Sequence, residues 1–256
     1  MHSVYGKRIG GIDLFLKEEE TLDNLIIGDL KIIQPKKGYR FSIDAVLLAH
    51  FCRLEGVKTV IDLGTGSGVI PLILSQRDKE IKIKGVEIQP SMVDRAGRSI
   101  QLNRLEGRIE IIPGDIKKIK EILPAACAEL IVCNPPFWRK NEGRISQNEE
   151  EAIARHELEV DLETVAKAAA YLLAPGGRFA FIQRAARFLE GVKALETNKL
   201  GISRVRWVHA KKDQPAKLVL VEGIKNKSSL LQVLPPLFIY EDDGDYCAEL
   251  KEIYGR

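Results

Sequence analysis

Residues 134–137 carry the side chains best suited to chemistry in this sequence. Asn134-Pro135-Pro136-Phe137 directly follows the apolar run 130–133, which is typical of a buried strand. The side-chain oxygen of Asn134 and the backbone carbonyl of Pro135 can each accept a hydrogen bond, and the prolines restrict the turn. Together they can hold both hydrogens of a planar NH2 group while Phe137 stacks on it. The segment indicates chemistry on an exocyclic amine, although Asn-Pro-Pro in isolation is more typical of a simple turn.

A second segment combines a buried strand with a glycine-rich turn. Residues 59–63 are mostly apolar, and Gly64, Gly66 and Gly68 follow before a helical pattern begins. Glycines let the backbone approach a ligand closely, and a helix N-terminus attracts negative charge. We therefore expect a nucleotide-type ligand. The dinucleotide fingerprint requires a third glycine where this chain has Val69, which weakens a nicotinamide interpretation.

Acidic residues mark the ends of three predicted strands. Asp62 lies near the end of residues 59–63, Glu87 ends residues 81–87, and Asp115 follows residues 110–112. A carboxylate at the end of the second strand suits the two hydroxyls of a ribose. Each acid alone could be a surface turn or cap residue, but three of them in order with a glycine turn favour one binding site.

The pattern Asp62-x-Gly64-x-Gly66-x-Gly68 resembles the binding loop of class I S-adenosylmethionine-dependent methyltransferases. The resemblance implies that Glu87 holds the ribose of S-adenosyl-L-methionine, that Asp62 lies near its methionine part and that Asp115 lies beside its adenine amine. Other residues that we expect at the cofactor are Thr65, Ile88, Ile116, Asn134, Arg40 and Phe41.

Segments along the whole chain resemble a narrower bacterial family, which methylates N6 of an adenine beside the anticodon of valine tRNA. They are residues 39–51, the glycine turn, 134–137, 154–157, 236–240 and 254–255. The resemblance implies direct methyl transfer from a sulfonium to nitrogen, tRNA as the partner, and Asn134, Pro135, Pro136 and Phe137 as the catalytic residues. Many members have tyrosine at Phe137, so stacking is retained here but any role of a hydroxyl is lost.

The distribution of charge is more informative than its total. The chain has 39 basic and 36 acidic residues and a net charge of +3, so the total does not argue for a nucleic-acid partner. Basic residues nevertheless gather in three clusters, the last of which includes Lys217, and the middle cluster follows the predicted amine site. The expected substrate-binding residues are Lys36, Lys37, Arg139, Lys140, Arg144, Lys211 and Lys212.

Composition sets limits that agree with these expectations. A chain of 256 residues that is 45% hydrophobic can form one large domain with additions. No apolar stretch approaches the roughly 20 residues of a membrane span, and no secretory signal is evident, so we expect a cytoplasmic protein. The scattered cysteines have no C-x-x-C spacing, and we expect neither a metal site nor disulfides.

Alternating strand and helix patterns predict an α/β, Rossmann-like class I methyltransferase fold. We expect a doubly wound, seven-stranded, mostly parallel sheet with an antiparallel last strand. The expected parts are an N-terminal β-hairpin extension (1–41), the methyltransferase domain (42–228) and a C-terminal extension (229–256). Within them we expect a hairpin of residues 25–27 and 30–33, a capping box of Ser91 with Asp94, a fifth strand at 178–182, and antiparallel pairing of 205–209 with 217–222.

Several alternatives remain open at this point. A site for a planar NH2 group also suits an N5-glutamine methyltransferase of a protein substrate or a guanine-N2 methyltransferase of ribosomal RNA. A catalytically silent RNA-binding module is disfavoured by the intact Asn134, Glu87 and glycine turn, and a nicotinamide oxidoreductase is disfavoured by Val69. We interpret His156 as a residue that orders a loop rather than as a catalytic group.

Overall fold

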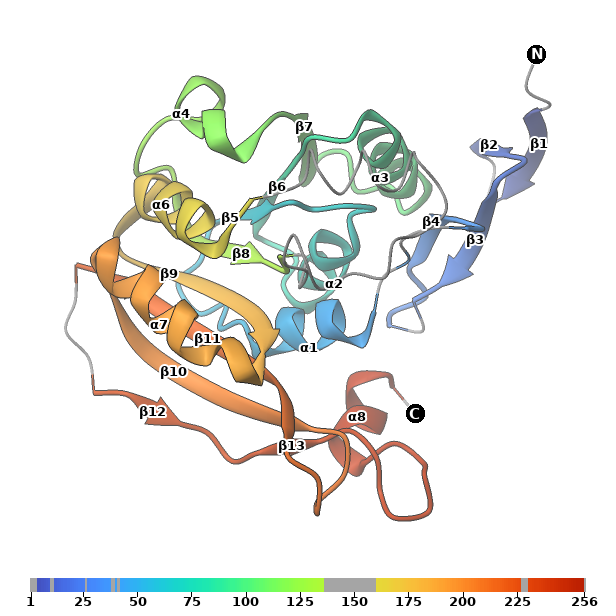
Figure 1. Ribbon diagram of the computed structural model, residues 1–256. Helices are drawn as coiled ribbons and strands as arrows, with labels where there is room; N and C mark the ends of the chain where they lie inside the picture. The colour runs from blue at the N-terminus through green and yellow to red at the C-terminus, as the bar shows by residue number, and fades with distance from the viewer. Residues whose placement is uncertain are drawn as a thin grey trace.

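The structure is a computed structural model, and it describes residues 4–9, 12–25, 27–37, 40, 42–135, 160–226 and 230–255. A mixed β-sheet with helices on both faces forms its centre (Figure 1). The strands follow the order β12-β10-β11-β9-β8-β5-β6-β7, and β13 pairs with β10 outside this path. In this sheet, β5 lies between β6 and β8, so the chain order reverses beside it, as in a doubly wound fold.

Seven longer strands of this sheet confirm the predicted fold class. Five neighbours run parallel, namely β7 (Ile109–Pro113), β6 (Lys82–Glu87), β5 (Thr59–Leu63), β8 (Ala128–Cys133) and β9 (Leu173–Arg184). The last of the seven in sequence, β11 (Ala216–Lys225), is antiparallel to both β9 and β10 (Leu200–His209). Two short strands that we did not predict, β12 (Gln232–Val233) and β13 (Leu237–Phe238), pair with β10 and extend the sheet.

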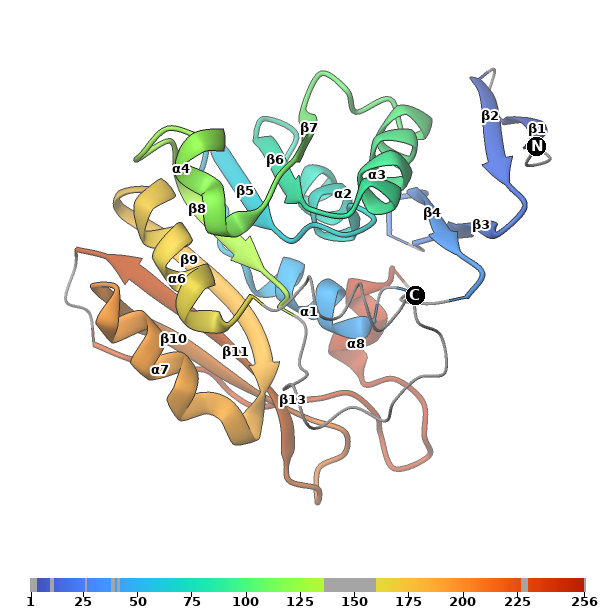
Figure 2. The same cartoon turned by 45° about the horizontal axis from the view of Figure 1, so that its top comes forward.

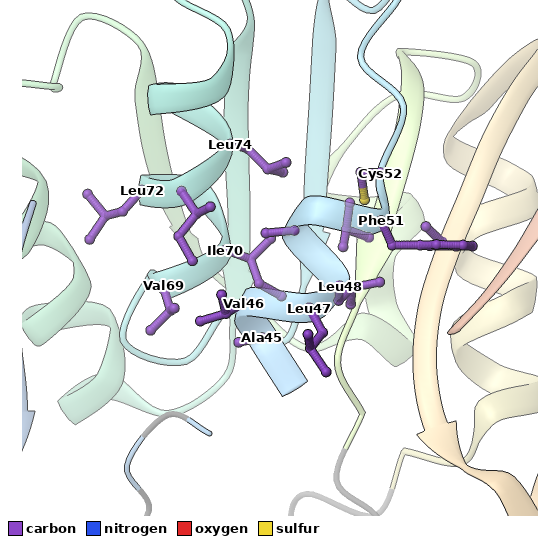
Figure 3. Packing of buried hydrophobic residues seen from close by; sticks show 14 of the residues in the cluster. Ala45, Val46, Leu47, Leu48, Phe51, Cys52, Val69, Ile70, Leu72 and Leu74 are labelled. Carbon is purple, nitrogen blue, oxygen red and sulfur yellow. The ribbon is translucent and has the colours of Figure 1, made fainter. Parts of the chain in front are cut away.

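Two hydrophobic clusters cover the two faces of the sheet. On one face lie α1 (Ile43–Phe51), α2 (Val69–Arg77), α3 (Pro90–Leu102) and the C-terminal α8 (Ala248–Ile253). On the other lie the short η1 (Ile116–Lys118) and α4 (Ile119–Ile122), together with α6 (Leu162–Leu172), η2 (Ala185–Arg187) and α7 (Phe188–Thr197). The helix α1 is buried on nearly all sides, as its sequence predicts, and its Val46 lies next to Ile70 of α2 (Figure 3).

The N-terminal residues form two hairpins instead of the single one expected. They are β1 (Val4–Ile9) with β2 (Ile12–Lys17), and β3 (Glu20–Asn24) with β4 (Lys31–Pro35). The prediction of a strand at residues 25–27 is wrong for Leu25 and Ile27, and Ile26 lies outside the described residues. Leu25 and Ile27 are buried in the core cluster, and residues 25 and 27–30 lie in the connection, which is closed by a 2.8 Å hydrogen bond from the Leu25 N–H to the Leu30 carbonyl. Burial of these apolar side chains overrides local strand propensity.

Ion pairs anchor the second hairpin, and the end of the first, on α3. Arg98 donates to both carboxylate oxygens of Glu20 in β3 over 2.6 and 2.8 Å, and Lys17, the last residue of β2, reaches Asp94 over 2.7 Å. The predicted capping box of Ser91 and Asp94 is therefore wrong: α3 begins shortly after Glu87, with Gln89 at the cap position, and Asp94 pairs with basic side chains instead. The hairpin thus depends on a tertiary contact that no local pattern encodes.

Of two other element boundaries, one agrees with the sequence prediction and one differs from it. Asp161 caps α6, as expected, since its carboxylate accepts a 2.8 Å hydrogen bond from the Thr164 N–H. The fifth parallel strand begins at Leu173, five residues before its predicted start, because Leu173 pairs with Ala128 of β8 across a bulge. No helix in the described part of the chain has the length and apolar character needed to span a membrane.

Candidate active site

The four polar residues singled out by the sequence lie at one edge of the sheet. Asp62 lies at the end of β5, Glu87 ends β6, Asp115 follows β7 by two residues, and Asn134 follows β8 directly. These four strands are parallel neighbours in the order β8-β5-β6-β7 (Figure 2). Because the carboxyl ends of parallel strands share an edge, the side chains face one common region.

The glycine turn between β5 and α2 has a backbone that only glycine adopts easily. Gly64, Gly66 and Gly68 have φ angles of 75°, 57° and 83°. The N–H groups of Gly64 and Thr65 both donate to the Val86 carbonyl, over 2.9 and 3.1 Å, which fastens the turn to β6. Among the described atoms, a Cβ on Gly66 would meet nothing within 4 Å, and one on Gly64 only Ile116 at 4.0 Å. The turn therefore leaves space for a ligand against its backbone.

Glu87 joins this turn to the beginning of α3. Its side chain is buried, and its two oxygens accept 2.9 Å hydrogen bonds from the N–H groups of Gly66 and Gln89. Burial raises the pKa of the carboxyl, and the backbone donors partly offset that rise. Each oxygen keeps acceptor capacity, so the oriented carboxylate can bind the two hydroxyls of a ribose.

Asp62 is fully buried, and neither of its oxygens has a hydrogen-bond partner among the described residues. Burial raises its pKa to about 7; the nearby Thr65 hydroxyl opposes the rise, and the charge of Glu87 adds to it. The Thr65 hydroxyl is itself buried, and it has no hydrogen bond of normal geometry to any described residue. Buried polar groups are normally paired, so these atoms fit a ligand that carries donor or cationic groups, as the methionine part of S-adenosylmethionine does.

Apolar and capping residues complete the region beyond Glu87. The side chain of Ile88 is 39% exposed, which is unusual for isoleucine, and Ile116 is partly buried against the core. Asp115 caps η1 by accepting a 2.8 Å hydrogen bond from the Lys117 N–H. An exposed isoleucine between two acids offers a surface on which a flat apolar ring can pack.

Sequence reasoning missed Gly85 and Met92. A Cβ on Gly85 would lie 2.7 Å from Cγ2 of Thr65 and 2.9 Å from Cδ1 of Ile111, so this glycine lets the turn pack directly on β6. A glycine inside a predicted strand is itself a signal of such an approach. The Ser67 hydroxyl donates to the sulfur of Met92 over 3.6 Å, which links the turn to α3; no sequence pattern marks that contact.

At the amine site, the structure describes two of the four predicted residues. Asn134 is half-buried and Pro135 is buried, directly after the fully packed end of β8. The other residues assigned to this region lie outside the described part of the chain, namely Pro136, Phe137, Arg139, Lys140, Arg144, Phe41 and His156.

The remaining basic candidates lie at two separate places. Lys36 and Lys37 are exposed after β4, and Arg40 is turned toward the β3–β4 hairpin, where it donates to Asp23 over 2.5 Å. Lys211 and Lys212 lie in the turn between β10 and β11, where the Lys211 ammonium donates to the Asp242 carbonyl over 3.1 Å. Within the described residues, no group of three or more His, Cys, Asp or Glu side chains is placed to hold a metal ion.

Together the doubly wound sheet, the glycine turn and the strand-end acids define a class I methyltransferase domain. Residues 43–205 match the family model of the methyltransferase small domain. The tRNA1(Val) (adenine(37)-N6)-methyltransferase of Porphyromonas gingivalis is 30% identical over 189 residues, which are 72% of this chain and 73% of that protein. The chain belongs to the methyltransferase small domain family and, within it, to the family of these tRNA1(Val) methyltransferases.

A further relative agrees with this placement, and a solved structure agrees with the fold. The Aliivibrio salmonicida protein of the same name is 31% identical over 162 residues, 63% of this chain, and the match spans slightly less than two thirds of that relative, 66% of its length. A predicted O-methyltransferase from Agrobacterium tumefaciens has a similar fold, with a TM-score of 0.68 at 20% identity, covering 83% of this chain and 95% of that one.

Proposed function

We propose that this chain is an S-adenosylmethionine-dependent N-methyltransferase that modifies the exocyclic N6 of adenine 37 in a valine tRNA. The observation that carries the proposal is the position of Asn134 at the end of β8, beside β5, whose end bears Asp62 and the glycine turn. A cofactor held by the turn and an amine held by Asn134 then meet at one edge of the sheet. The printed names of the family members supply the tRNA and the base.

The described residues divide the binding of the cofactor among them. When bound, S-adenosyl-L-methionine supplies an electrophilic methyl group on a sulfonium. Glu87 would accept hydrogen bonds from the ribose hydroxyls, and Asp62 with Thr65 would receive the polar groups of the methionine part. Ile88 and Ile116 would contact the adenine ring, and Asp115 would accept from its amine. Gly64, Gly66 and Gly68 keep the backbone close to the ligand.

Asn134 and Pro135 prepare the substrate nitrogen. The N6 lone pair of adenine is conjugated with the ring, so the free amine is a poor nucleophile. When the Asn134 side-chain oxygen and the Pro135 carbonyl accept its two hydrogens, the nitrogen becomes pyramidal and its lone pair is directed toward the methyl carbon. The nitrogen would bond to the methyl carbon as the sulfur–carbon bond breaks and leaves a neutral thioether, and the methylated nitrogen would then release one proton to solvent, so no strong base is needed in the first step.

The target base must leave its stack to reach this site. Turning out a base costs a few kcal/mol in a duplex and less in an unpaired loop. Stacking on Phe137, with Pro136 fixing the turn, offsets about 1–3 kcal/mol of that cost. We assign the phosphate contacts to Lys36, Lys37, Arg139, Lys140, Arg144, Lys211 and Lys212. A tRNA substrate implies a cytoplasmic protein.

We also propose that residues 1–41, 42–228 and 229–256 are the hairpin extension, the methyltransferase domain and the C-terminal extension. Pairing of β12 and β13 with β10, and the burial of Leu250, support the view that the last part packs on the domain rather than forming a separate one.

Transfer of labelled methyl groups into separate RNA and protein pools tests the function. Purified enzyme and labelled S-adenosylmethionine are incubated with tRNA, ribosomal RNA and release factor from cells that lack the gene. We expect label in tRNA alone, and mass spectrometry of the digested tRNA should find it as N6-methyladenine at position 37. Label in guanine of ribosomal RNA or in a protein glutamine would replace the proposal by one of the alternative methyltransferases.

A further inference from the structure

One half of the sheet extends beyond the other at the edge that carries Asn134. The last residue of β8, Cys133, pairs with Phe181 of β9, but β9 continues for three more residues to Arg184. At about 3.3 Å per residue this extension is roughly 10 Å long. β11 and β10 accompany it, since Arg184 pairs with Leu218 and Val208 also pairs with Leu218. We call the extended ends of β9, β10 and β11, with the turn between the last two, the step.

The step brings together basic residues that are far apart in the sequence. Arg184 ends β9, Lys217 is exposed on β11 one residue before the partner of Arg184, and Lys211 and Lys212 lie in the adjoining turn. Asp213 is the acidic residue of that turn, so the residues of the step itself carry an excess of positive charge, while the acidic run 241–243 lies beside Lys211 at its margin. The Asp242 carbonyl holds the Lys211 ammonium in position.

Strand alternation puts Arg184 on the same face of the sheet as the amine site. Ala180 and Ile182 of β9 face the cluster that contains α1 and α2, and so do Leu130 and Val132 of β8. Continued by two residues on β9 and two on β8, the same alternation assigns Arg184 and Asn134 to that face. Neighbouring strands lie about 4.8 Å apart, and Arg184 lies two residues, or roughly 7 Å, beyond the position on β9 across from Asn134. A side chain as long as that of arginine can therefore reach the nucleotide next to a base held at Asn134.

We propose that the step holds the sugar-phosphate backbone next to the target adenine, with Arg184, Lys212 and Lys217 as phosphate contacts that position the base for Asn134. The inference rests on the proposed tRNA substrate and adds Arg184 and Lys217 to its binding residues. An arginine suits the position nearest the reacting base because its planar group binds phosphate with two parallel hydrogen bonds. The lysines of the β10–β11 turn contribute point charges that contact phosphates farther along the RNA.

Salt-dependent binding of RNA tests the step. Wild-type protein and the Lys212→Gln/Lys217→Gln variant are titrated with an unmodified anticodon stem-loop of valine tRNA over a range of salt concentrations. Each phosphate contact with a single strand contributes about 0.7 to the slope of log K against log salt. We expect the slope of the variant to be shallower by about 1.4 and its affinity roughly ten-fold lower near 0.15 M salt, with a raised KM and little change in kcat.

A charge-matched control variant and a measurement of cofactor binding distinguish failure of this inference from failure of the proposed function. Lys58 and Lys82 are exposed at the opposite edge of the sheet, so Lys58→Gln/Lys82→Gln should bind RNA like the wild type. The step is refuted if the wild type methylates the stem-loop and the two double variants bind it equally. If the wild type binds S-adenosylmethionine but neither binds nor methylates any valine tRNA, the proposed function itself fails. Arg184→Lys should retain more affinity for the stem-loop than Arg184→Gln.

Discussion

The backbone N–H of Gly66 donates a 2.9 Å hydrogen bond to the carboxylate of Glu87, so the glycine turn and the end of β6 form one unit. The second oxygen of Glu87 is held by the Gln89 N–H at the beginning of α3. The acid is therefore oriented by two backbone groups from different loops before any ligand arrives. Preorganisation of this kind reduces the cost of ordering the site on binding.

Removal of the Glu87 carboxylate should weaken cofactor binding strongly. Hydrogen bonds to a charged group contribute about 1.5–3 kcal/mol each, which corresponds to one or two decades in affinity. We expect Glu87→Ala to lower the affinity for S-adenosylmethionine ten-fold to a hundred-fold by isothermal titration calorimetry, and Glu87→Gln to lose less. Unchanged affinity in both variants would mean that the ribose binds elsewhere.

Asp62 should make the stability of the ligand-free protein depend on pH. Its pKa is raised by burial from 3.8 to about 7, so between these values the folded chain keeps a proton that the unfolded chain has released. The free energy of unfolding therefore falls as pH rises through this range and levels off above about pH 7. Because asparagine does not ionise, Asp62→Asn should show a flatter profile and higher stability than the wild type near pH 8.

Denaturant unfolding at about pH 5 and pH 8 measures this difference. The exposed acid Glu80 provides the control, since Glu80→Gln should keep the wild-type profile. A wild-type stability that rises between the two pH values, or an Asp62→Asn profile as steep as the wild type, contradicts the assignment of a protonated buried carboxyl.

Asn134→Ala should separate catalysis from cofactor binding. Loss of one hydrogen-bond acceptor for the substrate amine removes about 1.5–3 kcal/mol of stabilisation of the transition state. We expect methyl transfer to fall ten-fold or more while the affinity for S-adenosylmethionine stays nearly unchanged. Asn198→Ala removes an amide at the far end of α7 and should keep normal turnover. Wild-type turnover in Asn134→Ala would refute the role assigned to this residue.

Two glycine substitutions should change stability in opposite directions. In Gly85→Ala the new methyl group meets Thr65 at 2.7 Å, which pushes the glycine turn away from β6. We expect a loss of about 1–3 kcal/mol in stability and weaker cofactor binding. Gly97 lies inside α3, where an added methyl group would meet nothing within 4 Å among the described residues, so Gly97→Ala should gain about 0.5–1 kcal/mol. Thermal unfolding compares the two, and a stable Gly85→Ala with full affinity would contradict the close packing.

Local patterns predicted most elements of the central sheet correctly. The buried strands β5 and β8 and the apolar helix α1 were clear because burial on nearly all sides leaves an apolar run in the sequence. The prediction was wrong where tertiary contacts compete with local preference. Leu25 and Ile27 contribute apolar side chains to the core instead of pairing, and Asp94 pairs with Arg98 and Lys17 instead of capping α3.

The sequence by itself determined the class of chemistry, because the glycines, the acids and Asn134 are local features at strand ends that all indicate one ligand-binding edge of a parallel sheet. Only the tertiary structure decided how those features meet. Pairing of distant strands brings Glu87 onto the Gly66 N–H, and an extension of β9 past β8 carries Arg184 beyond the strand end that Asn134 follows. Strand register and length depend on the burial of side chains from several separate segments at once, and no single segment of the chain contains that information.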